Sequence, residues 1–228
     1  MRSAHLFITS LLLLFCFGAI ADADEPARPY ADGKPPKDAV ILFDGNSQEA
    51  FTRDDGKEPA WKLADGELII TEGGGNLVSK HQFASAHMHI EFNLPDDPKQ
   101  KGNSGVYIHK LYEVQIIDSF NKNPYKPAQQ CASIYTLSPP SKNVCKKPGE
   151  WQTLDIQFIA PRLDKDGKLE SPARISVWHN GVEVQKDVEV KDGTGGAKGK
   201  PIVAKGPMLL QNHGSAVRFR NLWIRELP

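Results

Sequence analysis

The chain has 228 residues, with 28 Lys and Arg against 28 Asp and Glu, so its formal net charge is zero. This length can bury a sizeable core in one large or two small domains. The lack of a basic excess argues against a nucleic-acid binder, because phosphate recognition depends on Lys and Arg.

The first 21 residues have the pattern of a secretory signal peptide. Arg2 gives a positive start, residues 6–18 are apolar, and Ala19-Ile20-Ala21 is an A-x-A cleavage site. The apolar run is too short to span a bilayer. We therefore expect export, periplasmic or secreted, with residues 1–21 removed and no membrane anchor.

Residues 22–38 are rich in Pro, Ala and charge, which predicts a flexible linker. From there on, short strand-like runs alternate with turn signals, and no window has a helical apolar period over three turns. The runs cover residues 39–43, 61–63, 68–71, 87–94, 105–108, 112–117, 151–159, 174–179, 182–185, 207–211 and 217–225. Asn180-Gly181 suits a type I′ hairpin turn. The pattern predicts an all-β domain over residues 39–228, a large two-sheet jelly roll.

Two cysteines follow the signal segment, Cys131 and Cys145, on either side of a loop rich in Pro, Ser and Lys. In an oxidising compartment they can pair, and the bridge would stabilise the fold by roughly 3 kcal/mol in the chain-entropy model. Two free buried thiols are the alternative. No CxxC or Cys/His spacing accompanies them, so neither interpretation makes a metal site.

Alternation along residues 112–117 puts Glu113 and Gln115 on one strand face and apolar side chains on the other. Asp118 has the opposite parity to Glu113 and would join the polar face only through a bulge at Ile116-Ile117. A Glu/Gln face can be ordinary solvated sheet. However, the opposite face is fully apolar here, and polar groups on the concave face of a sandwich commonly bind a ligand. We interpret Glu113 and Gln115 as site residues.

Two other segments carry ionisable side chains on one face. His87, His89 and Glu91 have an i, i+2 spacing that could ligate a metal, although such alternation is common on exposed strands. Gln211 and His213 share a face at the end of another run, where His213 is either a turn residue or an acid–base group.

Seven short motifs follow one another along residues 39–227. They are Asn103–Tyr107, Tyr112–Ser119, Ser133–Tyr135, Pro148–Gln152, Asn180–Val182, Leu210–Gly214 and Phe219–Asn221. In this order they resemble the 3-keto-disaccharide hydrolase domain family. The resemblance implies a concanavalin A-like two-sheet jelly-roll sandwich, the fold of lectins and glucanases, and a carbohydrate-active enzyme.

The resemblance also implies a reaction, cleavage of the glycosidic bond of 3-keto-glycosides. A ketone at C3 acidifies the C2 hydrogen, so the bond at C1 can break by proton abstraction and elimination, with water added later. This chemistry needs a general base and a group that stabilises the enolate. Glu113 or Asp118 is then the candidate base, and His213 is the partner acid or base.

The same resemblance suggests which residues bind a small saccharide or glycoside. The candidate substrate contacts are Asn103, His109, Gln115, Tyr135 and Gln211. Many family members carry Arg or Gln where this chain has His109. A divalent metal on His89 or Glu91 could serve as the electrophile instead. We expect no nucleotide or redox cofactor, and a monomer.

Two alternatives stay open. The Glu113 to Asp118 segment is similar to the bulged Glu-x-Asp-x-x-Glu strand of laminarinase-like retaining glycosidases. Five strand residues span roughly 16 Å, however, whereas a retaining pair needs its carboxyl groups about 5 to 5.5 Å apart. The second alternative is a carbohydrate-binding module without catalysis, which stacks sugars on aromatic rings. The candidate rings are those of Trp61, Tyr107, Tyr112, Tyr135 and Trp151.

Overall fold

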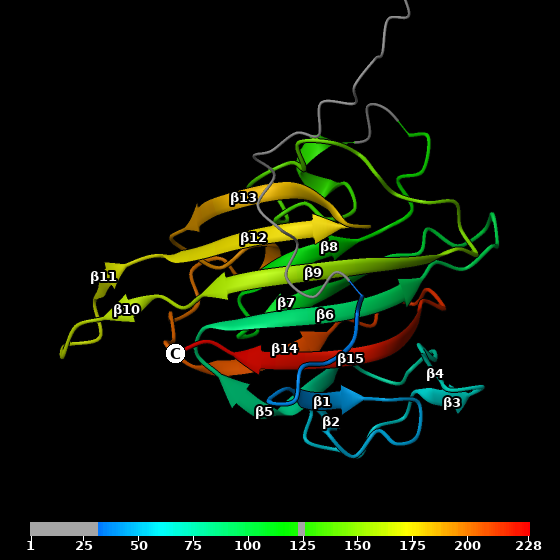
Figure 1. The fold of residues 1–228 in the computed structure, drawn as a ribbon, viewed down its shortest axis with the longest axis horizontal. Helices are drawn as coiled ribbons and strands as arrows, with labels where there is room; N and C mark the ends of the chain where they lie inside the picture. The colour runs from blue at the N-terminus through cyan, green and yellow to red at the C-terminus, as the bar shows by residue number, and fades with distance from the viewer. Residues whose placement is uncertain (1–31, 123–125) are drawn as a thin grey trace, which may run out of the picture.

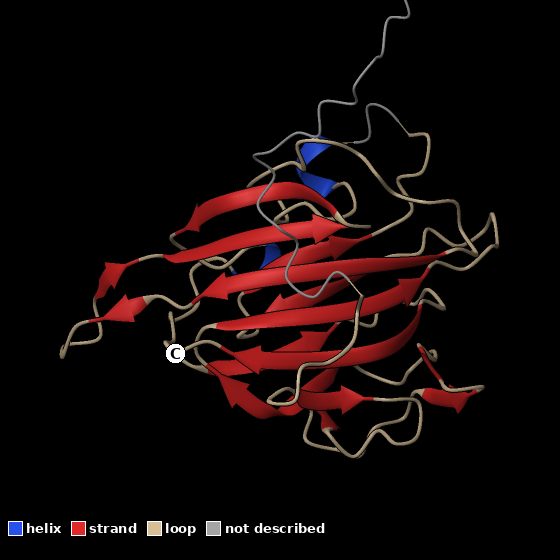
Figure 2. Cartoon of the chain, in the orientation of Figure 1, coloured by secondary structure: helices blue, strands red, loops and turns tan. Residues whose placement is uncertain are grey.

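In the computed structural model, residues 32–122 and 126–228 are described, so the predicted signal peptide lies outside the described residues. They form fifteen strands and two short 3-10 helices, shown in Figures 1 and 2. The strands are β1 Val40–Phe43, β2 Phe51–Arg53, β3 Lys62–Ala64, β4 Glu67–Ile69, β5 Leu77–Phe83, β6 Ala86–Asn93, β7 Ser104–Ile108, β8 Tyr112–Ile116, β9 Trp151–Ile159, β10 Arg162–Leu163, β11 Leu169–Ser171, β12 Ala173–His179, β13 Val182–Val190, β14 Gly206–Leu210 and β15 Arg218–Glu226; the helices are η1 Pro127–Gln129 and η2 Gly195–Ala197. Neither helix in this part of the chain has the length and apolar character needed to cross a membrane.

Most strands belong to two antiparallel sheets. The first sheet has the order β13-β12-β9-β6-β15-β4-β3, with β1 paired to β15, and the second has the order β2-β5-β14-β7-β8. β10 and β11 form a separate hairpin that projects from the ends of β9 and β12 (Figure 1). The predicted all-β two-sheet sandwich is confirmed.

The core lies between the two sheets and joins them through aromatic side chains. Phe158 of β9 is fully buried, and its ring centroid lies 4.7 Å from that of His109 and 5.7 Å from that of Tyr112 in β8. His109 and Tyr112 belong to the second sheet or its connecting turn, so Phe158 packs one sheet against the other.

Replacing Phe158 by Ala is expected to lower the free energy of unfolding by about 3 to 5 kcal/mol, because it removes apolar contacts and leaves a cavity. Urea unfolding measures this difference. The neighbouring Ile159 is 39% exposed, so Ile159→Ala serves as the control and should cost about 1 kcal/mol or less. Equal losses in the two variants would contradict this account of the core.

The hairpin prediction and the strand predictions have different outcomes. Asn180 and Gly181 join β12 to β13 with φ values of 53° and 83°, as a type I′ turn requires.

β5, in contrast, is absent from the predicted strands although it lies inside the second sheet. Polar and apolar residues do not alternate cleanly along β5, because the polar Ser79 occupies a buried position. Its hydroxyl donates to the carbonyl of His81 at 2.7 Å.

Residues 32–38, the described part of the predicted linker, are packed against the first sheet. The carbonyl of Gly33 accepts hydrogen bonds from Asn221 Nδ2 at 2.9 Å and Trp223 Nε1 at 3.2 Å. Asp38 forms an ion pair with Arg225 at 2.8 Å. This part of the segment is therefore fixed to β15 and is not a free linker.

Cys131 and Cys145 are both buried free thiols, and each shifts the pKa of the other. Donation from Cys131 lowers the pKa of Cys145, while burial raises the pKa of Cys131. Of the two alternatives that the sequence left open, the structure has the thiol form, with the two side chains in contact.

Candidate active site

The outward face of the second sheet carries the polar side chains that the alternation of β8 predicts. Val114 faces the core, and Glu113 and Gln115 lie on the opposite face. The strand register pairs Glu113 with Tyr107 of β7 and Tyr107 with Leu209 of β14. Side chains from three strands therefore form one row across this face.

Glu113 is a buried carboxyl group with few polar partners. It is 2% exposed, and Oε2 accepts a hydrogen bond from the Tyr107 hydroxyl at 2.7 Å. Burial raises its pKa to about 7, and the hydrogen bond from Tyr107 only partly opposes this shift. At neutral pH the group is close to half ionised, which suits a general base.

Tyr107 connects Glu113 to a second polar side chain. The Gln211 Nε2 group donates to the Tyr107 oxygen at 3.3 Å, and the Tyr107 hydroxyl donates to Glu113. Burial, followed by the negative charge of Glu113, raises the pKa of Tyr107 far above its usual range. The phenol therefore keeps its proton and holds the carboxylate in place.

Tyr107 and Gln211 also line a cavity of about 350 Å³ on this face. Its other lining residues are Asp54, Asn76, Lys110, Gly196, Ala197, Lys200 and Leu209. The cavity thus combines hydroxyl, amide, ammonium and carboxylate groups, the kinds of group that bind sugar hydroxyls. Glu113 lies behind Tyr107 and is not part of the cavity wall.

Two segments are hydrogen-bonded to the backbone of Glu113 along the edge of β8 that no other strand covers. The backbone N–H of Tyr135 donates to the Glu113 carbonyl at 2.9 Å, and the hydroxyl of Thr194 accepts from the Glu113 N–H at 2.8 Å. A Cβ at Gly195, whose φ is 50°, would lie 2.8 Å from the Tyr135 ring and 3.6 Å from Glu113 Oε2. The glycine lets the turn at 193–200 approach both groups closely.

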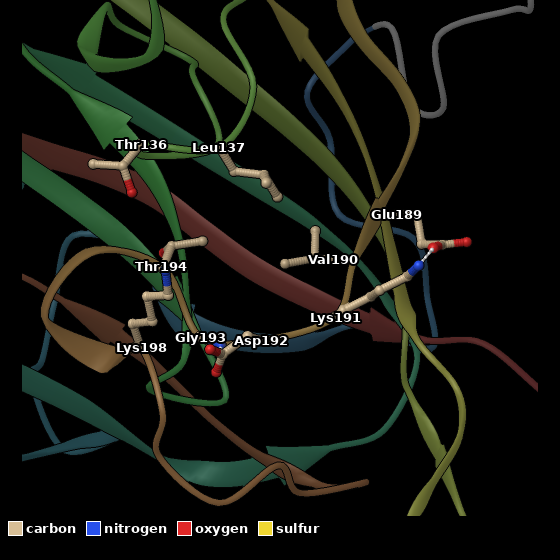
Figure 3. Close-up of a pocket in the computed structure, with 9 residues that line it drawn as sticks. All are labelled: Thr136, Leu137, Glu189, Val190, Lys191, Asp192, Gly193, Thr194 and Lys198. Carbon is tan, nitrogen blue, oxygen red and sulfur yellow. Dashed lines mark hydrogen bonds and ion pairs between the residues drawn. The ribbon is translucent and has the colours of Figure 1, made fainter.

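The same turn separates this cavity from a neighbouring one of about 460 Å³. Figure 3 shows the neighbouring cavity, with Thr194 and Lys198 on one side and Leu137 and Val190 near its centre. Glu189 pairs with Lys191 at 3.1 Å on its far side. No predicted site residue lines this second cavity within the described residues.

Asp118 and His213 do not join Glu113. The register of β7 with β8 is continuous and β8 ends at Ile116, so no bulge turns Asp118 onto the face of Glu113. Asp118 instead pairs with Lys122 at 2.6 Å. His213 is exposed and lines a third cavity, of about 340 Å³, together with Asn103. The three predicted catalytic residues therefore line no common cavity.

His109 and Gln115 are also placed away from the cavity. His109 is 3% exposed and its ring packs on Phe83 and Phe158 in the core, where burial lowers its pKa. Gln115 is 4% exposed, and its Oε1 accepts from the backbone of Ile116 at 3.1 Å. Of the five predicted substrate contacts, Gln211 lines the cavity, and Tyr135 is bonded through its backbone N–H to the Glu113 carbonyl.

His89 and Glu91 lie on the first sheet, away from Glu113, and have protein partners. His89 Nδ1 is 2.6 Å from Asp155 Oδ1, and its ring stacks on Trp223. Glu91 pairs with Arg220 at 2.7 Å. In the described part of the chain, no three or more His, Cys, Asp or Glu side chains are placed to hold a metal ion. These two residues belong to a buried ion-pair network and not to the predicted metal site.

Several cavity residues were not among the predicted site residues. Tyr107 is named from the sequence only as an aromatic ring on which a binding module could stack a sugar, although it has the same strand parity as Gly105 in the Asn-Ser-Gly motif. Lys110 and Lys200 line the cavity from turns. No periodic pattern marks such positions, since only the folded chain brings these turns next to β7 and β8.

The sequence matches the family model described as the 3-keto-alpha-glucoside-1,2-lyase-like domain over residues 38–225. Three solved structures of candidate glycosyl hydrolases from Parabacteroides distasonis ATCC 8503 are similar. One is 33% identical with a TM-score of 0.79, over 91% of this chain and 95% of that chain. The others are 20% and 22% identical with TM-scores of 0.65 and 0.60, over 83% of this chain and 94% and 99% of theirs. No curated protein matches the sequence.

Proposed function

Because the chain belongs to the 3-keto-alpha-glucoside-1,2-lyase-like domain family, we propose that this carbohydrate-active enzyme cleaves the glycosidic bond of 3-keto-glycosides. The family resemblance noted in the sequence is confirmed by this match. The observation that carries the proposal is the buried Glu113, with a pKa of about 7, in contact with a tyrosine that lines a polar cavity.

In this proposal the proton moves from the sugar to Glu113 through Tyr107. The Tyr107 oxygen accepts the proton from C2 as its own proton passes to Glu113 Oε2, so no free phenolate forms. The electron pair of the C2–H bond becomes the enolate, which then expels the oxygen at C1. This path fits Glu113 being buried behind Tyr107 and Tyr107 lining the cavity.

Gln211 supplies a hydrogen bond at the same place. One N–H of its amide donates to the Tyr107 oxygen, and the amide carries a second N–H that can donate to the enolate oxygen. The developing negative charge therefore meets a fixed donor inside the cavity. Proton return from Glu113 through Tyr107 to the leaving oxygen completes the elimination.

The positions of the carboxyl groups weigh against a retaining glycosidase. Asp54 is the one carboxylate that lines the cavity among the described residues. It follows β2, whereas Glu113 is on β8, four strand spacings away in the sheet order. At about 4.8 Å per spacing, this separation far exceeds the 5 to 5.5 Å or so of a retaining pair. A single base, in contrast, is enough for elimination.

The protein is expected to cleave a 3-keto-disaccharide and to leave the unoxidised parent disaccharide intact, because only the ketone acidifies the C2 hydrogen. Chromatography of the released sugars measures this, and a parallel series with a chelator separates a metal-assisted from a metal-free reaction. Cleavage of the parent sugar alone would contradict the proposal. Binding of both sugars without cleavage of either would instead identify a binding module.

A further inference from the structure

Two lysines lie on one side of the proposed substrate cavity. Lys110 occupies the turn between β7 and β8, and Lys200 ends the turn at 193–200. Both line the cavity together with Tyr107 and Gln211. Residues from two distant parts of the sequence therefore place two ammonium groups beside the proposed reacting centre.

Neither ammonium group has an anionic partner. Within residues 32–122 and 126–228, neither side chain makes an ion pair or hydrogen bond. Asp54, across the cavity, accepts from Asn76 Nδ2 at 2.7 Å. Asp192, near Lys200, accepts from the backbone of Gly193 at 2.7 Å and of Gly199 at 2.9 Å. The nearby carboxylates are thus occupied in holding turns and strand ends.

The pair also stands out against the charge of the whole chain. The net charge is zero, so two unpaired lysines on one cavity are not a consequence of a generally basic surface. Two like charges on one cavity repel each other, and an anion placed between them removes that repulsion. Lysine binds carboxylate and sulfate oxygens as a compact point charge.

We propose that Lys110 and Lys200 bind an anionic group of the substrate, a uronate carboxylate or a sulfate ester, so that the preferred substrate is an acidic 3-keto-glycoside. The inference rests on the proposed function and specifies its substrate class. Asp54, Asn76 and Gln211 then face the neutral hydroxyl groups on the other side of the cavity.

The test compares three 3-keto-disaccharides that differ only in one sugar: neutral, uronate and sulfated. The wild-type protein should have a kcat/KM about tenfold higher for an acidic substrate than for the neutral one at low salt, and added salt should reduce the difference. The double variant Lys110→Gln, Lys200→Gln should lose this preference, so that its kcat/KM values for the acidic and the neutral substrates agree within about twofold. The uronate and sulfate arms show which anion is recognised.

Lys198→Gln is the matched control. Lys198 lies on the same turn but lines the neighbouring cavity (Figure 3), so this variant should keep the acidic preference. An equal loss on neutral and acidic substrates in the double variant, or no preference in the wild-type protein, would overturn the inference and leave the proposed function intact.

If none of the keto substrates is cleaved, the proposed function fails and binding decides the inference separately. Calorimetry with the unoxidised uronate disaccharide should then show binding by the wild-type protein and about tenfold weaker binding by the double variant. Equal binding by the two proteins would overturn the inference.

Discussion

Replacing Glu113 by Gln should lower kcat for a 3-keto-disaccharide by about 10² to 10⁴-fold, the usual contribution of a general base. Gln has nearly the same shape as Glu but cannot accept the proton that Tyr107 passes on. Substrate binding should change little, because Glu113 does not line the cavity. Steady-state kinetics with calorimetric binding measures both quantities.

The matched control is Glu170→Gln, because Glu170 is exposed on the β10–β11 hairpin, which projects away from the two sheets (Figure 1). Its kcat should equal that of the wild-type protein. Glu113→Gln with full activity would remove Glu113 from the mechanism.

The pH dependence follows from the pKa of about 7 at Glu113. A base must be ionised to act, so kcat/KM should rise with pH and reach half its maximum near pH 7. Tyr107→Phe lacks the oxygen that passes the proton on and should lose most of its activity. The pKa of Glu113 in this variant, followed by NMR titration, should be higher, because the hydrogen bond from Tyr107 lowers it. A rate that is independent of pH between 5 and about 8.5 would contradict the assignment.

The same pKa has an effect of known sign on stability. The folded-state pKa lies above the ordinary value of 4.5, so the folded protein binds a proton more tightly than the unfolded chain. The stability from this group is present below pH 4.5 and is lost as the pH rises through about 7. Glu113→Gln should remove this loss. Above pH 7 the midpoint temperature of thermal unfolding should therefore be higher in the variant than in the wild-type protein, while its activity is lower.

Replacing Gly105 by Ala should lower kcat by about 10²-fold, as expected when a catalytic group is displaced by about 1 Å. A Cβ at this position would lie 2.6 Å from Glu113 Oε1 and 3.1 Å from its Cγ. The carboxyl group is buried and is held by Tyr107, so it can move only by breaking that hydrogen bond. Gly105 is not among the residues with positive φ, so the backbone itself accepts Ala.

Gly196→Ala is the control for this prediction. Gly196 also has an ordinary φ, and a Cβ there would meet nothing within 4 Å, although the residue lines the same cavity. Its kcat should stay within about threefold of the wild-type value. Gly105→Ala should unfold at a lower temperature than Gly196→Ala, because it loses a buried hydrogen bond. Equal activity of the two variants would show that the position of the Glu113 carboxyl group does not limit the reaction.

Local patterns in the sequence were sufficient for the features that depend on neighbouring residues. Alternation in β8 placed Glu113 on the face opposite Val114, because side chains of a strand alternate whatever lies around it. Asn180-Gly181 predicted its turn for a similar reason, since the required φ values belong to the two residues themselves. Ordered motifs along the domain were also enough to indicate the family.

The same reasoning failed where the answer depends on partners far along the chain. The sequence predicts that Asp118 and His213 act together with Glu113 in catalysis. In the structure, however, Asp118 follows the end of β8 and His213 follows β14. The loop after β14 carries His213 to another cavity, and Asp118 forms an ion pair with Lys122. His109 looked like a polar contact, but the turn after β7 directs it into the core.

By itself, the sequence determined the all-β class, the family and the strand face that carries Glu113, because these follow from composition, period and order. Only the tertiary structure decided that Tyr107 donates to Glu113 and Gln211 to Tyr107, and that burial raises the pKa of Glu113 to about 7. It also decided that Lys110 and Lys200 share a cavity with Tyr107 and Gln211. Strand order in a sheet and the burial of a charge depend on contacts between distant segments, which no local pattern specifies.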